Sequence, residues 1–209
     1  MNRMKILELF CGTKSFSNVA EEYGHRTFTI DVVEEFEPDL CKDILQLEIS
    51  DIPFKPDFIW ASPPCKTFSV ASISHHWKGG KCAYIPKTKE CKIGLKLLNK
   101  TLNIINLLNP TYYIIENPRG VMRKIGIMRD LNKNTVTYCQ YGDDRMKPTD
   151  LWNNIYHWKS REMCKNGDSC HQSAPRGSRT GTQGRENSKE RSRVPRELCE
   201  EILEVVQLK

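Results

Sequence analysis

Short apolar runs alternate with amphipathic stretches along most of the chain, which is typical of strands alternating with helices. Strands are predicted at residues 5–10, 26–30, 39–44, 56–61, 112–116, 135–139 and from 149 onward. Helices are predicted over 15–22, 92–108 and 195–207, the second with Ile93 and Leu107 in its buried stripe. This order predicts an α/β fold with a mostly parallel seven-stranded sheet and helices on both faces.

Two stretches break the pattern. Residues 67–89 show little periodicity and are long for a connection, so we expect a functional lid or a disordered loop. The polar stretch after Trp158 cannot bury a core, and it is either an extended loop or partly disordered. We therefore divide the chain into a main domain at 1–157, a short basic segment at 158–192, and a C-terminal helix at 193–209 that packs back on the main domain.

Composition narrows the class of protein. Hydrophobic residues make up 38% of the 209 residues and charged residues 28%, as expected of a globular protein in solution. No apolar run approaches the roughly 18 residues of a membrane helix, and the N-terminus enters a strand directly. We expect a cytoplasmic protein without a signal peptide or a membrane partner.

The nine cysteines and the net charge of +6 say something about redox state and partners. Without an export signal or a regular cysteine framework, reduced thiols are expected rather than disulfides. Arginines outnumber acidic residues between Arg176 and Arg196, which is compatible with phosphate contacts, although a solvated basic face gives the same pattern.

Candidate chemistry lies at the ends of two predicted strands. Ser62-Pro63-Pro64-Cys65 follows one strand, and Glu116-Asn117-Pro118 ends the next long one. If these strands are parallel neighbours, Cys65 and Glu116 meet at the edge of the sheet where ligands bind. A thiol beside a carboxyl group is a minimal pair for nucleophilic catalysis. The alternatives are a structural thiol and an ordinary capped strand end.

The N-terminal third has the layout of a nucleoside-binding half-domain. A strand, a turn at Gly12, a helix and a second strand ending in Asp31 follow one another. In such domains the turn allows the backbone to approach the ligand, and the acid bonds ribose hydroxyls. Only one of the usual glycines is present, and both Asp31 and Asp43 could instead be loop residues or helix caps.

Taken together, these motifs resemble the DNA cytosine-5 methyltransferases, in particular small phage-type members. The resemblance runs from Met4 to about Glu201 and is strongest at Ser62–Cys65 and Glu116–Pro118. It implies a Rossmann-like methyltransferase fold and methyl transfer from S-adenosylmethionine to C5 of a cytosine flipped out of DNA. It assigns addition to cytosine C6 to Cys65, a contact near N3 to Glu116, and orientation of the pocket to Asn117, with the loop after Cys65 as a lid.

The resemblance also implies binding residues. Those for the cofactor are Phe10, Gly12, Asp31, Val32, Asp43, Ile44 and Pro64. Arg145 and Lys147 resemble a basic motif that contacts base and backbone, although Arg145 could equally be an ion-pair partner. Arg176 and Arg179, set among glycines, are predicted to clamp the DNA backbone, with a flexible basic loop as the alternative.

Departures from the family pattern leave other functions open. The last cofactor-side motif, an Asn-Ser segment, has no counterpart, and the recognition region is short. RNA could replace DNA as the substrate. The chain could also be a weakly active, DNA-binding accessory subunit that needs a partner, so a monomer and a partner-dependent complex both remain open. Lys14 near the cofactor hints at a modified donor.

A cluster of metal-binding residue types follows the main domain. His157, Cys164, Cys170 and His171 are candidate ligands of a structural zinc ion, and Cys139 is another possible ligand. A metal would stabilise a segment that is poor in core residues. The spacing does not match the common paired patterns, and unligated loop residues are the alternative.

Overall fold

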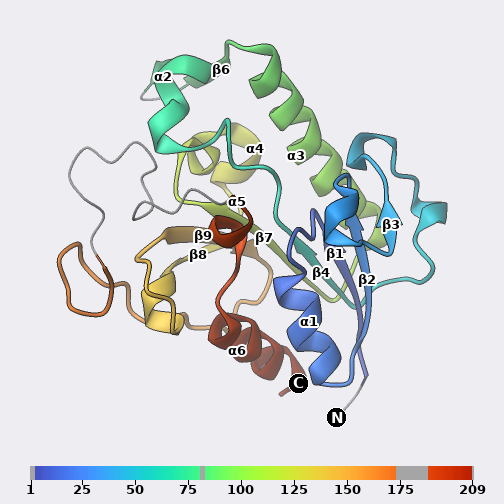
Figure 1. Cartoon of the computed structure of the whole chain (residues 1–209). Helices are drawn as coiled ribbons and strands as arrows, with labels where there is room; N and C mark the ends of the chain where they lie inside the picture. Colours follow the sequence, from blue (N-terminus) through green and yellow to red (C-terminus); the bar gives the residue numbers. More distant parts are fainter. Residues whose placement is uncertain (1–2, 81–82, 173–187, 209) are drawn as a thin grey trace.

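The computed structural model describes residues 3–80, 83–172 and 188–208 (Figure 1). Its centre is a seven-stranded sheet in the order β3-β2-β1-β4-β7-β9-β8. The strands are β1 (Lys5–Leu9), β2 (Arg26–Asp31), β3 (Leu40–Cys41), β4 (Phe58–Ala61), β7 (Tyr112–Pro118), β8 (Lys133–Thr137) and β9 (Pro148–Asn153). The first five strands in this order pair in parallel, whereas β9 is antiparallel to both of its neighbours. The predicted mostly parallel sheet is thus confirmed.

The order of the strands creates a crevice for ligands. Strands β2 and β3 lie on one side of β1, and β4 and β7 continue on the other side. In parallel α/β sheets, ligands bind at the carboxyl ends of the strands where the order reverses in this way. The residues that follow β1 and β4 are therefore in the position where a ligand is expected.

Helices cover both faces of the sheet (Figure 1). On one face α1 (Ser15–Glu22) and α6 (Arg196–Gln207) share a buried apolar cluster with β1, β4, β7 and the β8–β9 region. On the other face lie α3 (Lys89–Leu108) and the short α4 (Gly126–Arg129). Each fully buried aliphatic side chain in these layers contributes about 1.5–3 kcal/mol to stability. This packing attaches the C-terminal helix α6 to the first helix, α1.

Helix α3 shows how the local pattern positions an element. Thr88 caps its start by accepting a hydrogen bond from the Cys91 backbone N–H at 3.2 Å, and Asn109 ends it in a left-handed conformation before Pro110. The predicted buried stripe was wrong in part. Ile93 is 41% exposed and Leu107 60% exposed. The face toward the sheet is instead formed by Cys91, Gly94, Leu98, Thr101, Ile104, Ile105 and Leu108.

The segment after Cys65 is more ordered than its sequence indicates. It contains the 3-10 helix η4 (Val70–Ser72), the helix α2 (Ile73–His76), and a hairpin of β5 (Trp77–Gly80) and β6 (Ala83–Pro86). The Trp77 indole is buried and donates a 2.6 Å hydrogen bond to the Thr67 carbonyl, while Phe68 is fully buried beside it. Of the two alternatives for 67–89, the disordered loop is therefore wrong for the described residues, because Phe68 and Trp77 anchor the segment. A role of this segment as a lid stays a prediction.

The remaining elements are short. They are the 3-10 helices η1 (Glu34–Phe36), η2 (Ile44–Gln46), η3 (Ile49–Asp51), η5 (Val121–Lys124) and η6 (Tyr138–Tyr141), and the helix α5 (Ser188–Ser192). The predicted strand at 39–44 shrinks to β3, because η2 begins directly after Asp43. Within the described ranges, all eight cysteines are free thiols. No helix in this part of the chain is long and apolar enough to cross a membrane.

Candidate active site

Cys65 lies on an anchored turn at the carboxyl end of β4. The Ser62 backbone N–H donates to the Leu9 carbonyl at 3.1 Å, and the Trp60 indole donates to the Ser62 hydroxyl at 2.9 Å. The backbone N–H of Phe68 then donates to the Cys65 carbonyl at 2.9 Å and closes the turn. Cys65 itself is exposed to solvent. The thiol is thus held on a fixed backbone at the mouth of the crevice.

Glu116 and Asn117 lie on the neighbouring strand, β7. This strand pairs in parallel with β4, with Ala61 opposite Ile115, so the residues that follow leave the sheet at the same edge. Asn117 is fully buried, and its side-chain amide donates a 2.8 Å hydrogen bond to the Pro63 carbonyl. The turn that carries the thiol is therefore tied directly to the strand that carries the acid.

The Glu116 carboxylate sits in a buried polar group. It is 5% exposed, and its Oε1 accepts a 2.9 Å hydrogen bond from the Tyr138 hydroxyl. The Lys147 ammonium lies 4.0 Å from the same oxygen and 4.5 Å from the centre of the Tyr138 ring. Burial lowers the pKa of Lys147, and the charge of Glu116 opposes this effect. Burial and Glu116 together raise the pKa of Tyr138, which keeps the phenol protonated as a donor.

The electrostatics of this group act on the thiol. Protein atoms packed around Cys65 desolvate it and raise its pKa, and the negative charge of Glu116 raises it further. Lys147 and Arg191 lower the pKa of the thiol. Since the thiolate is the nucleophile, these cations are the groups that favour the reactive form.

The loops that follow Cys65 and Glu116 also hold each other. The Phe68 carbonyl accepts a 2.8 Å hydrogen bond from the Val121 backbone N–H, and Ser69 bridges to Gly120. A β-carbon at Gly120 would lie 2.1 Å from the Phe68 carbonyl oxygen. Only glycine allows this close approach, so Gly120 lets the loop after Glu116 pack directly against the loop after Cys65.

Arg145 makes its contacts within the chain. It is only 2% exposed, and its guanidinium pairs with Asp143. It also donates to the backbone carbonyls of Glu190 at 3.0 Å, Arg191 at 3.1 Å and Arg193 at 3.3 Å. Its donors face other parts of the chain, so the structure agrees with the ion-pair alternative, and Arg145 holds the segment before α6. A contact of Arg145 with nucleic acid stays a prediction. Buried charges require such paired surroundings.

The other predicted nucleic-acid contacts divide into two cases. Lys147 is buried, and its ammonium donates a 3.0 Å hydrogen bond to the Arg191 carbonyl and lies 4.0 Å from Glu116. The ammonium is therefore directed toward the acid rather than toward open solvent. Arg176 and Arg179 lie outside the described residues, and their contacts with DNA remain predictions.

The predicted cofactor residues meet where β1 and β2 end. The Asp31 carboxylate accepts hydrogen bonds from the backbone N–H of Gly12 and of Val33, each at 2.9 Å. Phe10 and Gly12 both adopt positive φ angles of 56° and 48°, which bends the turn toward Asp31. Two of the four lone-pair positions of a carboxylate are used in this way, so Asp31 can still accept from a ligand.

The other predicted cofactor residues are more dispersed. Asp43 caps η2 by accepting from the Leu45 backbone N–H at 2.9 Å, as the alternative reading of this residue expected. Ile44 is buried in the core, whereas Val32 is 65% exposed and Pro64 is exposed beside Cys65.

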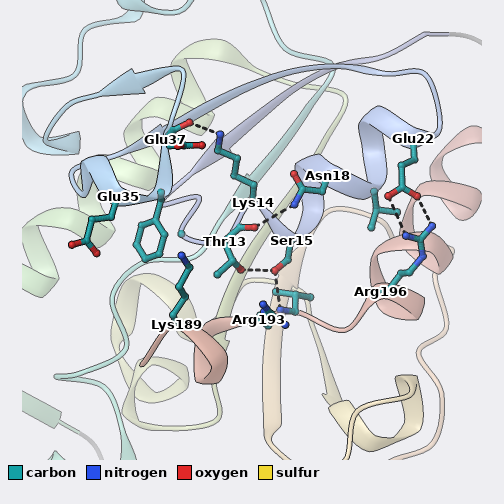
Figure 2. Close-up of a pocket in the computed structure, with 14 residues that line it drawn as sticks. Thr13, Lys14, Ser15, Asn18, Glu22, Glu35, Glu37, Lys189, Arg193 and Arg196 are labelled. Carbon is teal, nitrogen blue, oxygen red and sulfur yellow. Dashed lines mark hydrogen bonds and ion pairs between the residues drawn. The ribbon is translucent and has the colours of Figure 1, made fainter. Parts of the chain in front are cut away.

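A cavity of about 580 Å³ opens beside the turn at Gly12 (Figure 2). Its walls are the first turns of α1, the η1 region with Glu35 and Phe36, and the C-terminal residues Lys189 and Arg193. This volume is in the range of small-molecule sites. Gly12 alone of the predicted cofactor residues lines it.

Sequence reasoning missed the C-terminal wall of this cavity. The Val194 backbone N–H donates to the Ser15 hydroxyl at 3.2 Å, and the guanidinium of Arg196 bonds Glu22 on α1 with contacts of 3.1 and 2.6 Å. Lys189 lies 5.5 Å from the centre of the Phe36 ring. No local pattern signals contacts across more than 150 residues, although the basic run before α6 was a general hint.

The proposed zinc ligands also regroup. Cys164, Cys170 and His171 come together with Cys139. His157 does not join them, because its Nε2 lies 3.2 Å from the Val205 carbonyl near α6. The candidate set is therefore corrected by exchanging His157 for Cys139.

The chain is similar to known proteins in sequence and in fold. The sequence profile of the family described as "C-5 cytosine-specific DNA methylase" matches residues 4–141. A protein of Frog virus 3 (isolate Goorha) named "Probable DNA (cytosine-5)-methyltransferase" is 33% identical over 172 residues, which are 80% of this chain and 78% of that protein.

Two solved structures share the fold. An E. coli protein described as "putative DNA modification methyltransferase encoded within prophage" matches with a TM-score of 0.53 and 16% identity, over 72% of this chain and 46% of that one. The Entamoeba histolytica methyltransferase EhMeth matches with a TM-score of 0.51 and 12% identity, over 79% of this chain and 58% of that one. The chain thus spans about half the length of these solved proteins, and at this identity the likeness concerns the fold alone.

Proposed function

Because the chain belongs to the C-5 cytosine-specific DNA methylase family, we propose that it methylates C5 of cytosine in DNA through a covalent adduct with Cys65. The observation that carries the proposal is the placement of Cys65 and Glu116 at the ends of two adjacent parallel strands. Asn117, next to Glu116, is hydrogen-bonded to the turn that carries Cys65. A nucleophile and an acid on one rigid sheet edge have the pre-organisation that addition to a heterocycle needs.

The proposed reaction begins at cytosine C6. The Cys65 thiolate forms a bond to C6, and the electron pair of the C5–C6 double bond moves toward C5 and the N3 side of the ring. Glu116 faces N3 and, in its carboxylic acid form, donates its proton to N3, which neutralises the negative charge that develops there. The carboxylate that remains is held by Lys147 and the Tyr138 hydroxyl. After the new carbon–carbon bond has formed at C5, a base takes the C5 proton and Cys65 leaves as a thiolate, which restores the double bond.

The surrounding groups suit this chemistry. Lys147, 4.0 Å from Glu116, places a positive charge where both the thiolate and the carboxylate benefit. The Tyr138 hydroxyl donates to Glu116 at 2.9 Å and fixes the orientation of the carboxyl group. Because the target carbon lies within the base stack, the cytosine must leave the duplex to reach this pair.

The cavity at Gly12 fits a nucleoside cofactor. It lies beside the reversal of strand order, the Gly12 backbone is open toward it, and the Asp31 carboxylate keeps acceptor capacity for hydroxyl groups. We assign S-adenosylmethionine to this cavity, with Gly12, Ser15 and Phe36 in its wall and Asp31 behind the turn. The cofactor, when bound, supplies the methyl group as an electrophilic sulfonium substituent.

Transfer of tritium from labelled S-adenosylmethionine tests the proposal. The wild-type chain and Cys65→Ser are compared on matched DNA and RNA of mixed sequence, with Cys41→Ser as the control for loss of an exposed thiol. We expect label in DNA cytosine with the wild type and the control, and none with Cys65→Ser. Label in RNA alone would favour the RNA alternative. A folded wild-type chain that binds the cofactor but labels neither polymer would contradict independent activity and favour the accessory-subunit alternative.

A further inference from the structure

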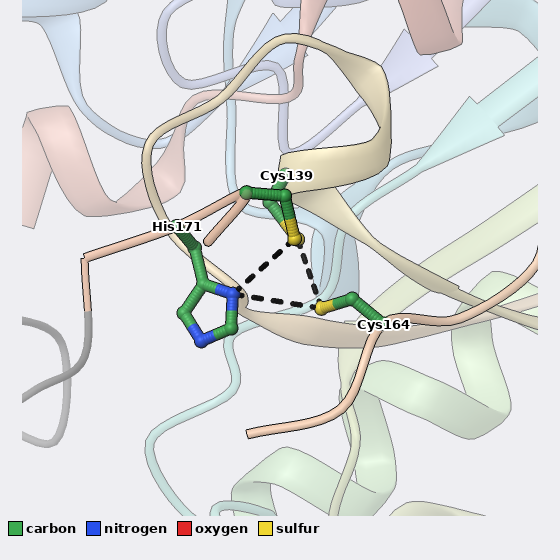
Figure 3. A group of neighbouring side chains, drawn as sticks. Cys139, Cys164 and His171 are labelled. Atoms are coloured by element: carbon green, nitrogen blue, oxygen red, sulfur yellow. Dashed lines mark hydrogen bonds between the residues drawn. The ribbon is translucent and has the colours of Figure 1, made fainter. Parts of the chain in front are cut away.

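Four potential metal ligands converge beside the end of β8. Figure 3 labels three of them, Cys139, Cys164 and His171. Cys139 lies on η6, directly after this strand, and Cys164, Cys170 and His171 come from the segment that follows Trp158. Each offers one donor atom, and these four atoms lie within 4.8 Å of one another. None of the four is part of the catalytic or cofactor groups described above.

The distances are close to those of a tetrahedral site. The Cys170 sulfur is 3.6 Å from that of Cys139 and 3.5 Å from His171 Nδ1, while the Cys164 sulfur is 3.7 Å from the same nitrogen. Around one zinc ion, with bonds of about 2.3 Å to sulfur and about 2.1 Å to nitrogen, the ligand atoms are separated by about 3.6–3.8 Å. The Cys139 and Cys164 sulfurs, at 3.0 Å, need to move apart by less than 1 Å to fit this geometry.

The surroundings support thiolate ligands. Cys139 and Cys164 are 8% and 9% exposed, so two of the sulfurs are shielded from water. The Gln140 side-chain amide donates to the Cys170 sulfur at 3.4 Å, and the Cys164 backbone N–H is fixed by the Thr137 hydroxyl at 3.1 Å. Donors and anchors of this kind orient the ligands of metal sites.

The segment after Trp158 has little core of its own that could stabilise it without a metal ion. Residues 159–172 contain no helix or strand, and few of their side chains are buried. The hydrogen bond from the Gln172 backbone N–H to the Asp144 carbonyl at 2.9 Å is one of few backbone bonds that tie it to the main domain. A metal ion can supply the stability that so small a core cannot.

We propose that Cys139, Cys164, Cys170 and His171 bind one structural Zn²⁺ ion as a closed Cys₃His site. Binding displaces the three thiol protons to solvent, and His171 coordinates through Nδ1. Four protein ligands leave no open position, so the ion anchors the segment after Trp158 to β8 rather than activating water. A disulfide between Cys139 and Cys164 is the competing chemistry, and it would leave Cys170 and His171 without a role.

The test measures metal in the full-length chain, purified under reducing conditions without chelator. We expect about one zinc per chain by mass spectrometry, and a tetrahedral Co²⁺ spectrum with a thiolate charge-transfer band after exchange. Cys164→Ser and His171→Ala should reduce the zinc content at least about tenfold. Cys41→Ser and His157→Ala, which remove a thiol and an imidazole outside the cluster, should retain it.

A further variant keeps the test valid if the loss of a ligand prevents folding. His171→Cys should bind one metal ion and change the Co²⁺ spectrum from three-sulfur to four-sulfur coordination. The proposal is overturned if the folded wild-type chain takes up no zinc when titrated, if the ligand variants hold as much zinc as the controls, or if peptide mapping finds a Cys139–Cys164 disulfide in the reduced preparation.

Discussion

The side-chain amide of Asn117 donates a 2.8 Å hydrogen bond to the backbone carbonyl of Pro63. This bond joins the strand that carries Glu116 to the turn that carries Cys65, across 54 residues of sequence. Both partners are buried, so neither can exchange the bond for one to water. The distance between the proposed nucleophile and the proposed acid therefore depends on it.

Asn117→Ala should weaken both stability and activity. The Pro63 carbonyl would lose its buried donor, which costs about 1–3 kcal/mol in the free energy of unfolding. The turn at Cys65 would also lose its position, and methyl transfer should fall at least about tenfold. Denaturant unfolding and steady-state kinetics measure the two effects. Asn99→Ala removes an exposed amide that bonds only its own helix, and it should change neither quantity.

Lys147→Met should make Cys65 less reactive. The cation lowers the pKa of this thiol, so its removal should raise the pKa and move the alkylation profile to higher pH. The rate at which iodoacetamide modifies the Cys65 peptide, followed by mass spectrometry against pH, gives the pKa directly. Lys147→Arg should keep the profile near that of the wild type. Lys124→Met removes an exposed cation that lies near Tyr84, and an equal shift in that variant would refute the role of Lys147.

Arg145→Gln distinguishes an internal role from a contact with DNA. The change leaves the Asp143 carboxylate unpaired and frees the backbone carbonyls at Glu190 and Arg193, so we expect a loss of about 3–5 kcal/mol in stability. Hydrogen exchange should rise within residues 188–196. If the variant instead keeps its stability and loses DNA affinity with a smaller salt dependence, the predicted contact with nucleic acid is supported.

Glu8→Gln should remove a pH dependence of folding. Burial on β1 raises the pKa of Glu8 from 4.5 to about 7, although the Ser17 backbone N–H bonds the carboxylate. Between these two values the folded chain holds a proton that the unfolded chain has released, so stability falls as the pH rises from about 4.5 to about 7. At pH 8 the neutral variant should be more stable than the wild type by up to ~3 kcal/mol, and at pH 4 the two should be nearly equal. Equal stability at pH 8 would contradict the assignment.

Patterns of apolar and turn residues predicted the first half of the sheet and the placement of Cys65 and Glu116 at its edge. The helix at 15–22 and the strand from Arg26 were found because apolar periodicity and turn residues agree there. Cys65 and Glu116 were predicted to share one edge because Cys65 follows a buried strand, Glu116 lies near the end of another, and the ends of parallel strands meet at one edge. The structure places both at that edge, and their catalytic roles stay predictions.

The contacts of Arg145 and the position of His157 were not evident from the sequence, and the physical cause is the same for both. A DNA contact of Arg145 was predicted from the resemblance to a basic motif, with an ion pair as the alternative, and the sequence around it does not reveal that backbone carbonyls at residues 190, 191 and 193 accept its hydrogen bonds. His157 was preferred to Cys139 because ligand spacing along the chain gives little information when one ligand lies on η6, 25 residues before Cys164. Contacts made by distant segments decide burial and pairing, and local periodicity does not contain them.

The proposed reaction requires Cys65 as the nucleophile that adds to cytosine. The most direct measurement uses DNA that contains 5-fluorocytosine, because fluorine cannot leave C5 as a proton does and the adduct cannot resolve. With S-adenosylmethionine present, we expect a denaturation-resistant protein–DNA complex whose mass maps to the Cys65 peptide. Cys65→Ser should give no complex. A wild-type chain that methylates ordinary DNA but forms no such complex, or forms it at another residue, would contradict the account.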